Sequence, residues 1–343
     1  MKLHTELGAR SYDITVENGC LSRAGEVLNL SRRVLIVTDT GVPAVYAQTV
    51  AEQCRAPVTV TVPAGEGSKS LPVFGRLLSR MLAEGFTRTD CVLALGGGVV
   101  GDLAGFAAAC FMRGIDFYNI PTTLLAQVDS SIGGKTAIDL DGVKNCVGAF
   151  WQPRAVLIDP ATLATLPRRQ IANGMAEAVK MALTSDAGLF RLFETGGESD
   201  LETVILCSLE IKRRVVEADE RESGMRRILN FGHTLGHGIE AAAGLHGLLH
   251  GECVALGMLP MCAPEVRRRL IPVLRRLGLP TVLPVDPDAV LAQICHDKKC
   301  DGAAVSYVEV PRVGEYEIRR EPVAAFCAKM RPALEAMRKG GTA

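Results

Sequence analysis

Three short apolar segments in the first hundred residues each end in glycine or an acid. They are RVLIVTD (33–39), VTVTVPAGE (58–66) and DCVLALGGG (90–98). Their β-branched and aliphatic residues are typical of buried strands, whereas LPVFGRLLSRMLAEG (71–85) has apolar residues at helical spacing before a closing glycine. Strands that alternate with helices predict a mostly parallel sheet. The N-terminal part of the chain is therefore predicted to be an α/β domain.

The pattern changes after Leu166 and Pro167. Long amphipathic segments follow, and we predict helices at 168–184, 201–218, 228–243 and 251–268. Near the C-terminus, AVSYVEV and EYEIRRE are predicted to form a small hairpin. A chain of 343 residues is long enough for two domains. We predict an α/β domain with a mostly parallel sheet over residues 1–166 and a mainly α-helical domain over residues 167–343.

Composition excludes several classes of protein. Apolar residues make up 48% of the chain, which is typical of a globular protein, and a net charge of zero argues against nucleic acid or an anionic membrane as the main partner. The sequence contains neither a signal peptide nor an apolar stretch that could span a bilayer. Its 11 cysteines are scattered without a C-x-x-C pair, which indicates reduced thiols. We expect a soluble cytoplasmic protein that binds neither nucleic acid nor membrane.

The glycines after the third predicted strand indicate a nucleotide site. Gly96, Gly98 and Gly101 have G-x-G-x-x-G spacing between a strand and a helix, where backbone N–H groups can bind a pyrophosphate. This spacing alone is weak, because many such turns bind nothing. The acid expected about 20 residues later to bind a ribose is also missing. Asp39, or Glu66 beside Lys69, could replace it.

Residues 113–153 are unusually polar for an apolar domain. Two lysines, an arginine and an asparagine near paired glycines suit a phosphate or carboxylate, and long loops in compact domains are often functional. The alternative is a solvated loop. The polar candidates are Arg113, Thr122, Thr123, Asp129, Ser130, Lys135, Lys144 and Asn145.

The segment NFGHTLGHGIEAAAGLHGLLHGE holds four of the six histidines. His233 and His237 are four residues apart on one helical face, and His250 begins the next predicted helix. Glu177, with Lys180 three residues later, lies on an apolar helical face, where an unpaired carboxylate is costly. Two imidazoles and one carboxylate would form a catalytic zinc site with an open position, although a lone buried histidine is more often structural. Spacing does not show whether His237 or His250 is the second imidazole ligand, and His246 is the weakest candidate. Spacing also does not show which of the charged residues just before these histidines has a role in the site. Those charged residues and their neighbour are Lys212, Glu222, Arg226 and Asn230.

Taken together, the motifs resemble the 3-dehydroquinate synthase family. In family order the chain contains GGGVVGDLAGF, RGI, IPTTLLAQVDSSIGGKTAI, KN, GAFWQP, TLATLP, AEAVK, LNFGHTLGHGIE, HGE and DKK. The resemblance implies an NAD-binding α/β domain, a helical metal- and substrate-binding domain, and an active site in the cleft between them. It also implies a homodimer, NAD and one divalent metal ion, Zn²⁺ or Co²⁺.

The resemblance also assigns roles to residues. It implies the metal ligands Glu177, His233 and His250, with His237 as a substrate contact. Contacts to NAD are implied for Asp39, Glu66, Lys69, Gly98, Val99, Val100, Gly101, Asp102, Thr122, Thr123, Lys135, Lys144, Thr162 and Thr165. The implied substrate-site residues are Asp129, Lys135, Asn145, Lys180, Lys212, Glu222, Arg226, Asn230, His237 and one lysine of the Lys298-Lys299 pair, with Lys299 slightly favoured. Arg113 is implied to reach the substrate phosphate bound by the neighbouring subunit.

The implied reaction converts a phosphorylated sugar acid, 3-deoxy-D-arabino-heptulosonate 7-phosphate, to 3-dehydroquinate and phosphate in the shikimate pathway. The nearest alternative is another sugar phosphate cyclase, of the amino-dehydroquinate, deoxy-inosose or epi-valiolone type. A metal-dependent polyol dehydrogenase is a weaker alternative, because it needs no phosphate pocket. The third alternative is a catalytically inactive regulator that binds NAD or a metal.

Overall fold

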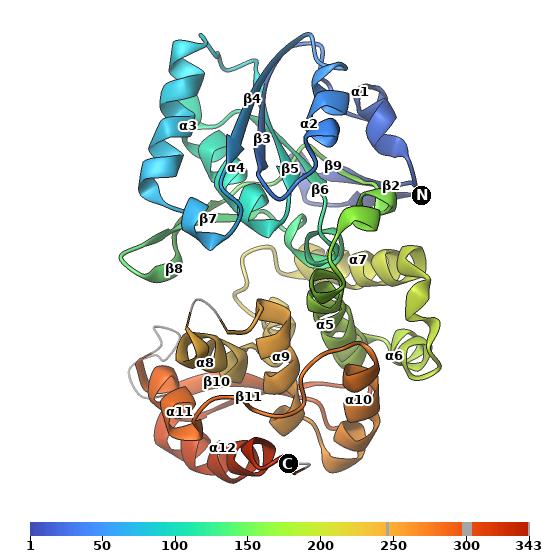
Figure 1. Cartoon of the computed structure of the whole chain (residues 1–343), viewed down its shortest axis with the longest axis vertical. Helices are drawn as coiled ribbons and strands as arrows, with labels where there is room; N and C mark the ends of the chain where they lie inside the picture. The colour runs from blue at the N-terminus through green and yellow to red at the C-terminus, as the bar shows by residue number, and fades with distance from the viewer. Residues whose placement is uncertain (245–246, 297–303, 342–343) are drawn as a thin grey trace. The chain divides into compact units, whose positions relative to one another are not determined.

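The computed structural model describes residues 1–244, 247–296 and 304–341. The chain divides into two compact units (Figure 1). The first comprises Met1–Pro167 and Lys212–Glu220, and the second comprises Arg168–Ile211 and Arg221–Ala343. Among the described residues, no helix has both the length and the apolar character needed to cross a membrane.

The first unit is built on a seven-stranded sheet in the order β1-β2-β9-β6-β5-β3-β4. β1 and β2 are antiparallel, and every other neighbouring pair is parallel, as predicted. The strands are β1 (Lys2–Thr5), β2 (Tyr12–Val16), β3 (Arg33–Asp39), β4 (Ala56–Val62), β5 (Cys91–Gly96), β6 (Asp116–Pro121) and β9 (Ala155–Ile158).

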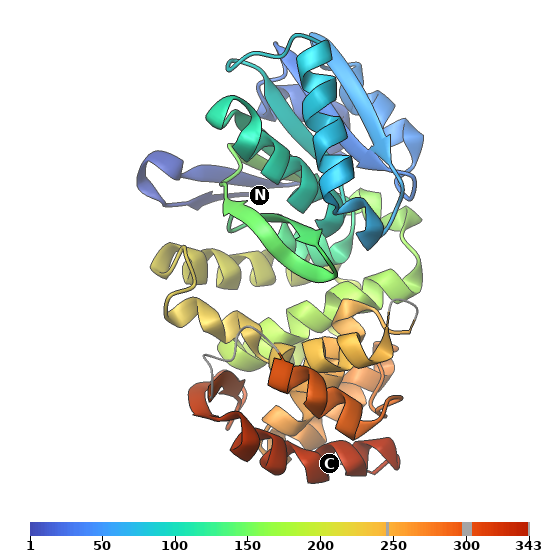
Figure 2. The same cartoon turned by 90° about the vertical axis from the view of Figure 1, so that its left-hand side faces the viewer.

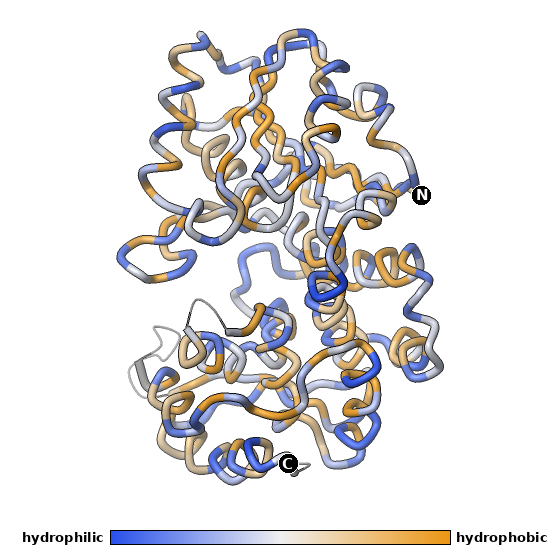
Figure 3. Tube along the Cα trace, in the orientation of Figure 1, coloured by the Kyte–Doolittle hydropathy of each residue, from blue (hydrophilic) through white to orange (hydrophobic). Residues whose placement is uncertain are grey.

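Helices cover both faces of this sheet (Figures 1 and 2). Because successive side chains of a strand point to opposite faces, Leu35 and Val37 pack with α3 (Leu71–Ala83) and α4 (Gly98–Cys110). Val34 and Ile36 face the other way, toward a cluster that includes residues of α1 (Ala24–Val27) and α2 (Ala44–Ala51). Figure 3 shows the resulting hydrophobic strands at the centre of the unit.

The order in which successive strands are added to the sheet reverses at β3. From β3 the chain moves to β4 on one side, and it later returns to β5 on the other side of β3. Val37 of β3 pairs with Ala94 of β5, so both strands end at the same edge of the sheet. In open α/β sheets, ligands bind outside the carboxyl ends of the strands at such a reversal.

The prediction of a polar loop over residues 113–153 was wrong in part. After β6, this region contains a π-helical turn (Ala126–Ser130, η5) and an antiparallel hairpin of β7 (Lys135–Leu140) and β8 (Val143–Phe150). Ile138 of β7 is fully buried in the core shared with α3 and α4. The paired glycines and charges concealed a short strand whose apolar side chains point inward.

The second unit is mainly helical and carries the predicted C-terminal hairpin of β10 (Ala304–Glu309) and β11 (Glu317–Pro322). These features and the parallel sheet confirm the predicted fold class. The last seven residues of α7 belong to the first unit and its remainder to the second. The helices are α5 (Arg168–Ser185), α6 (Ala187–Glu194), α7 (Leu201–Ala218), α8 (His233–Ala243), α9 (His250–Met258), α10 (Pro264–Arg276), α11 (Pro287–His296) and α12 (Val323–Arg338).

Two predicted helices are interrupted. The segment 251–268 divides into α9, a 3-10 turn (Leu259–Met261, η9) and α10, because Pro260 and Pro264 cannot donate helical hydrogen bonds. The segment 228–243 begins as a 3-10 helix (Met225–Asn230, η8), and α8 starts only after Gly232, whose φ of 77° is left-handed. The second break places His233 at the first residue of α8.

Candidate active site

Three helices of the second unit bring one acid and two histidines together. Glu177 comes from the middle of α5, while His233 and His250 are the first residues of α8 and α9. Glu177 Oε1 lies 3.7 Å from His233 Nε2 and 3.5 Å from His250 Nε2. Ligand atoms at tetrahedral angles around zinc lie about 3.3–3.6 Å apart when each bond is about 2.0–2.2 Å. The three side chains therefore have the spacing of a metal centre.

Glu177 has the environment expected of a metal ligand. It is 1% exposed, its Oε2 contacts the Lys180 ammonium, and its Oε1 has no hydrogen-bond partner in the part of the chain that the structure describes. Burial alone would raise the pKa of Glu177, but the Lys180 ammonium that contacts it and the nearby His233 hold that pKa well below its usual range. A buried anion with incomplete hydrogen bonding favours a bound cation.

The two histidines are oriented by their other ring nitrogen. His233 Nδ1 lies 3.1 Å from the Phe231 carbonyl oxygen, which favours a lone pair on Nε2. Burial and the Lys180 charge hold the pKa of His233 well below its usual range, so the ring is neutral. His250 Nδ1 lies 3.4 Å from Glu240 Oε2. Burial lowers the pKa of His250, but Glu177 and Glu240 outweigh it and raise that pKa to about 9.

A second possible ligand set consists of His237, Glu240 and His250. The His237 ring centroid lies 5.4 Å from that of His233, as the spacing on one helical face predicts, and 6.0 Å from that of His250 in α9. One nitrogen of His250 faces Glu177 and the other faces Glu240. Sequence analysis assigned no role to Glu240, although its place three residues after His237 was a usable signal.

Of the charged candidates before α8, Glu222 and Arg226 lie in the second unit with Asn230, whereas Lys212 belongs to the first. The 3-10 helix η8 packs against α5, and its Arg226 is only 2% exposed. Asn230 donates a hydrogen bond of 2.5 Å to Glu222 Oε1. The structure thus joins Asn230 with Glu222, and Arg226 is a buried cation of the same segment. Lys299, Lys298 and His246 lie outside the described residues.

The candidate nucleotide contacts of the first unit follow the carboxyl ends of its parallel strands. Asp39 ends β3, the turn Glu66–Lys69 follows β4, and Gly98–Asp102 follows β5. Thr122 and Thr123 follow β6, while Thr162 and Thr165 lie in the 3-10 helix Pro160–Thr165 (η6) after β9. Because the strands are parallel, these groups share one edge of the sheet.

Two features of this edge suit a dinucleotide. A Cβ at Gly97 would lie 3.0 Å from Thr123 Cγ2, and one at Gly98 would lie 3.0 Å from Ser130 Oγ, so the turn has no room for side chains. Beside Asp39 is a cavity of about 650 Å³, within the roughly 300–1,000 Å³ typical of ligand sites. Asp39, at the end of the strand next to the one that leads into the glycine turn, is part of the cavity lining. The cavity lining includes Thr38, Asp39, Thr40, Gly41, Ala47, Thr59 and Thr61.

Lys69 links candidate nucleotide and substrate residues. Its side chain is 4% exposed, and its ammonium lies 2.8 Å from Asp102 Oδ2 and 3.4 Å from Glu66 Oε1 and donates to the side chain of Asn145. Burial raises the pKa of Asp102 to about 6, although Lys69 opposes this rise. Asn145 has a left-handed φ of 53°, and its N–H donates to Asp139 Oδ1 at 2.7 Å.

We expect Lys69→Met to weaken NAD binding about tenfold and to lower the free energy of unfolding by about 3 kcal/mol at pH 8. The loss should be smaller at pH 5, where Asp102 is mostly protonated in the folded state and needs Lys69 less. NAD titration and urea unfolding at both pH values measure these effects. Arg80→Met, which breaks an exposed ion pair with Glu84, is the control and should cost about 0.5 kcal/mol or less. A loss of stability that grows toward acid pH would contradict this account.

Other substrate candidates also meet in the first unit. The Lys212 side chain is 6% exposed, and its ammonium lies 2.8 Å from Asp129 Oδ1 and donates to the Asp129 carbonyl oxygen at 2.6 Å. Arg113 is exposed and has a left-handed φ of 70°, directly after Met112 with a φ of 50°. Lys144 and Lys135 are also exposed. These positions give the first unit both a buried and an exposed set of cations.

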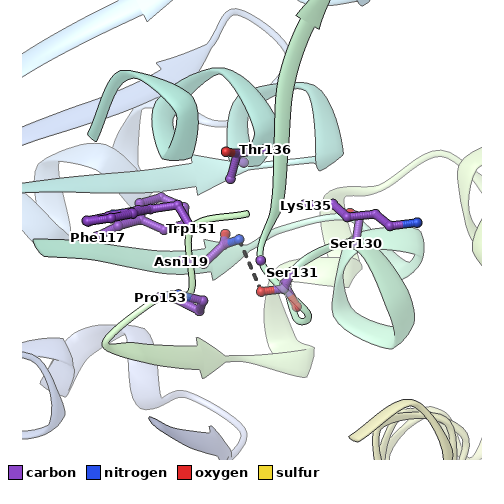
Figure 4. Close-up of a pocket in the computed structure, with 10 residues that line it drawn as sticks. Phe117, Asn119, Ser130, Ser131, Lys135, Thr136, Trp151 and Pro153 are labelled. Carbon is purple, nitrogen blue, oxygen red and sulfur yellow. Dashed lines mark hydrogen bonds between the residues drawn. The ribbon is translucent and has the colours of Figure 1, made fainter. Parts of the chain in front are cut away.

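Lys135 borders a small cavity that is not a substrate site. In Figure 4, Lys135 points away from this cavity, which Asn119, Ser131 and Trp151 help to line. Its volume of about 10 Å³ would hold one water molecule. Ser131 Oγ is buried and has no hydrogen-bond partner among the described residues, so water would satisfy it.

Comparisons with solved structures support NAD and a divalent metal ion as the cofactors. A 2-deoxy-scyllo-inosose synthase complexed with carbaglucose-6-phosphate, NAD⁺ and Co²⁺ has a TM-score of 0.88 and 26% identity, covering 97% of this chain and 99% of that one. The 2-epi-5-epi-valiolone synthase of Streptomyces hygroscopicus subsp. jinggangensis 5008, with NAD⁺ and Zn²⁺ bound, has a TM-score of 0.87 and 29% identity, covering 98% of both chains. The glycerol dehydrogenase of Schizosaccharomyces pombe, at 15% identity and a TM-score of 0.61, shares the fold.

Sequence comparisons are more specific. The family model of the 3-dehydroquinate synthase N-terminal domain matches residues 59–173, and that of its C-terminal domain matches residues 174–300. The 3-dehydroquinate synthase of Symbiobacterium thermophilum is 45% identical over 339 residues, covering 90% of this chain and 94% of the relative. That of Streptococcus suis (strain 05ZYH33) is 41% identical over 346 residues, covering 94% and 98%. By motif, fold and identity over nearly its whole length, the chain belongs to the 3-dehydroquinate synthase family.

Proposed function

We propose that this protein is an NAD- and metal-dependent 3-dehydroquinate synthase, a carbon–oxygen lyase. It converts 3-deoxy-D-arabino-heptulosonate 7-phosphate to 3-dehydroquinate and phosphate. The observation that carries the proposal is the buried Glu177 carboxylate, whose Oε1 lies 3.7 Å from His233 Nε2 and 3.5 Å from His250 Nε2. The relatives at 41–45% identity support this substrate over those of the cyclases at 26–29%.

Each domain has its own task in this proposal. Residues 1–166 bind NAD through the strand-end groups from Asp39 to Thr165, and residues 167–343 bind one Zn²⁺ or Co²⁺ through Glu177, His233 and His250. When bound, NAD would supply reversible hydride transfer at carbon 5 of the substrate, and the metal would supply Lewis-acid stabilisation of negative charge on the oxygen of that carbon. The alternative set of His237, Glu240 and His250 lacks a fully buried carboxylate, because Glu240 has a side-chain exposure of 20%.

Fixed cations hold the two ends of the substrate. Lys135 and Arg113 bind the phosphate, with Arg113 contributed by the other subunit of a homodimer. Arg226 and Lys212 bind the carboxylate; both are buried, which strengthens charge-assisted hydrogen bonds. Holding the substrate in one pose keeps its phosphate near the hydrogen of carbon 6, so the phosphate can accept that proton as it leaves. The other substrate contacts are Asp129, Asn145, Lys180, Glu222, Asn230, His237 and Lys299.

Phosphate release from the heptulosonate phosphate tests the proposal. We expect turnover without lasting NADH absorbance, its loss in a chelator, and its recovery with Zn²⁺ or Co²⁺, because NAD is regenerated in each cycle. Accumulating NADH would instead indicate a dehydrogenase, and no turnover would indicate a regulator. Sedoheptulose 7-phosphate, glucose 6-phosphate and the amino analogue serve as competing substrates in the same assay. A cytoplasmic location stays a prediction.

A further inference from the structure

One face of α5 carries three side chains that all contact the beginning of α9. Arg169, Asn173 and Glu177 are four residues apart, so they lie one above the other on the helix. Glu177 faces His250, Asn173 accepts a hydrogen bond of 2.6 Å from the N–H of Gly251, and Arg169 forms an ion pair with Glu252. Three successive turns of α5 thus contact three successive residues of α9.

The contact of Arg169 is bidentate. Its Nε and Nη2 donate to the two oxygens of Glu252 at 2.7 and 2.8 Å, and Nη2 also donates to the Gly247 carbonyl oxygen at 3.0 Å. Glu252 Oε2 accepts a further hydrogen bond of 2.8 Å from the N–H of Leu249. The Glu252 side chain is 8% exposed, so these charge-assisted bonds lie partly out of water. They connect α5 to the residues on both sides of His250.

From these contacts we propose that Arg169, Asn173 and Glu252, here called the α5–α9 clamp, position His250 for metal binding. The inference rests on the metal site proposed above and assigns positioning roles to three residues that are not ligands. Among the described residues, the possible ligand sets contain none of the three.

The helix end explains why His250 needs this clamp. His250 is the first residue of α9, and the first N–H groups of a helix have no partner within it. Asn173 satisfies the N–H of Gly251 from outside the helix, and no N-cap side chain does so, because residue 249 is a leucine. Without these contacts the first turn would fray, and the imidazole would lose its fixed distance from Glu177.

Gly251 makes the contact close. A Cβ at this position would lie 2.1 Å from the Asn173 carbonyl oxygen, so only glycine allows α9 to approach α5 this tightly. The approach brings His250 Nε2 within 3.5 Å of Glu177 Oε1. Backbone packing at Gly251 sets the distance between α5 and α9, and the clamp holds the first turn of α9, with His250, in a fixed position along α5.

Zinc affinity of the full chain tests the clamp. The metal-free protein, prepared with a chelator, is titrated with Zn²⁺ against a chromophoric chelator. We expect Arg169→Met, Asn173→Ala and Glu252→Gln to raise the dissociation constant for Zn²⁺ by about 10–100-fold, the range for residues that orient metal ligands. NAD affinity and far-ultraviolet circular dichroism should stay at wild-type values. Arg168→Met removes a neighbouring arginine outside the clamp and should change the constant less than about twofold.

The conservative variant separates positioning from folding. Lysine cannot bind both oxygens of Glu252, so Arg169→Lys should fold and show a smaller rise in the dissociation constant than Arg169→Met. Should Arg169→Met fail to fold, Arg169→Lys carries the test. Wild-type Zn²⁺ affinity in folded clamp variants, with affinity lost in His250→Ala, would overturn the clamp and leave the metal site intact. No Zn²⁺ binding by the wild-type protein would overturn the metal site itself.

Discussion

The His250→Ala protein is expected to purify without bound metal and to lose about a thousandfold or more of the phosphate-releasing activity. A bound metal contributes several kcal/mol of transition-state stabilisation, and about 4 kcal/mol corresponds to a thousandfold in rate. His250 supplies the nitrogen 3.5 Å from Glu177, so its loss leaves the buried carboxylate with one imidazole. Metal analysis and phosphate release measure the two effects.

NAD affinity should be nearly unchanged in this variant. The candidate nucleotide contacts belong to the first compact unit, and His250 belongs to the second. Equilibrium titration of NAD thus provides an internal measure of folding that does not depend on the metal. A parallel loss of NAD affinity would indicate general unfolding.

His237→Ala is the matched control, because this histidine lies on the same face of α8 as His233. We expect it to retain metal and to lose activity, since its proposed role is substrate contact. Normal metal content in His250→Ala would contradict the ligand assignment. Loss of metal in His237→Ala combined with retention in Glu177→Gln would move the site to His237, Glu240 and His250, the other set with suitable spacing.

The sequence predicted those parts of the fold that depend on local periodicity. The strand at 33–39 and the helix at 201–218 agree with β3 and α7 to the residue, because their apolar patterns are long and uninterrupted. The hairpin β7–β8 was taken for a loop, since its glycines and charges obscure a short buried strand. The break between α9 and α10 was missed although Pro260 and Pro264 mark it.

The site was predictable only in part. The i, i+4 spacing placed His233 and His237 on one face, but it left open which histidine meets Glu177. The answer depends on how α9 packs against α5, which no local sequence pattern encodes. The assignment of His250 therefore came from the family resemblance. The link from Lys69 to Asp102 and Asn145 was also out of reach, because it joins residues 33 and 76 positions apart. Tertiary contacts of this kind arise from the sheet topology.

The second large effect concerns Arg113, which we propose acts in the partner subunit's site. Arg113→Ala and Lys180→Met should each abolish nearly all activity as homodimers. Arg113 is exposed on two consecutive left-handed residues, a strained turn that presents it to the outside, whereas Lys180 is 1% exposed beside Glu177. Methionine keeps the volume of the buried lysine stem while removing its charge.

Heterodimers of differently tagged chains turn this difference into a test of site composition. A dimer of one Arg113→Ala chain and one Lys180→Met chain has one complete site if the site is shared, so it should recover about half of the wild-type activity per dimer. The reciprocal dimer pairs a wild-type chain with the double variant Arg113→Ala/Lys180→Met. A shared site then leaves both of its centres incomplete and inactive. If each subunit instead used its own Arg113, the first dimer would be inactive and the second would keep about half of the activity. A shared site and a site within one subunit predict opposite results for two dimers that carry the same substitutions, so a general loss of stability cannot imitate either result. Failure to isolate any heterodimer would count against the homodimer.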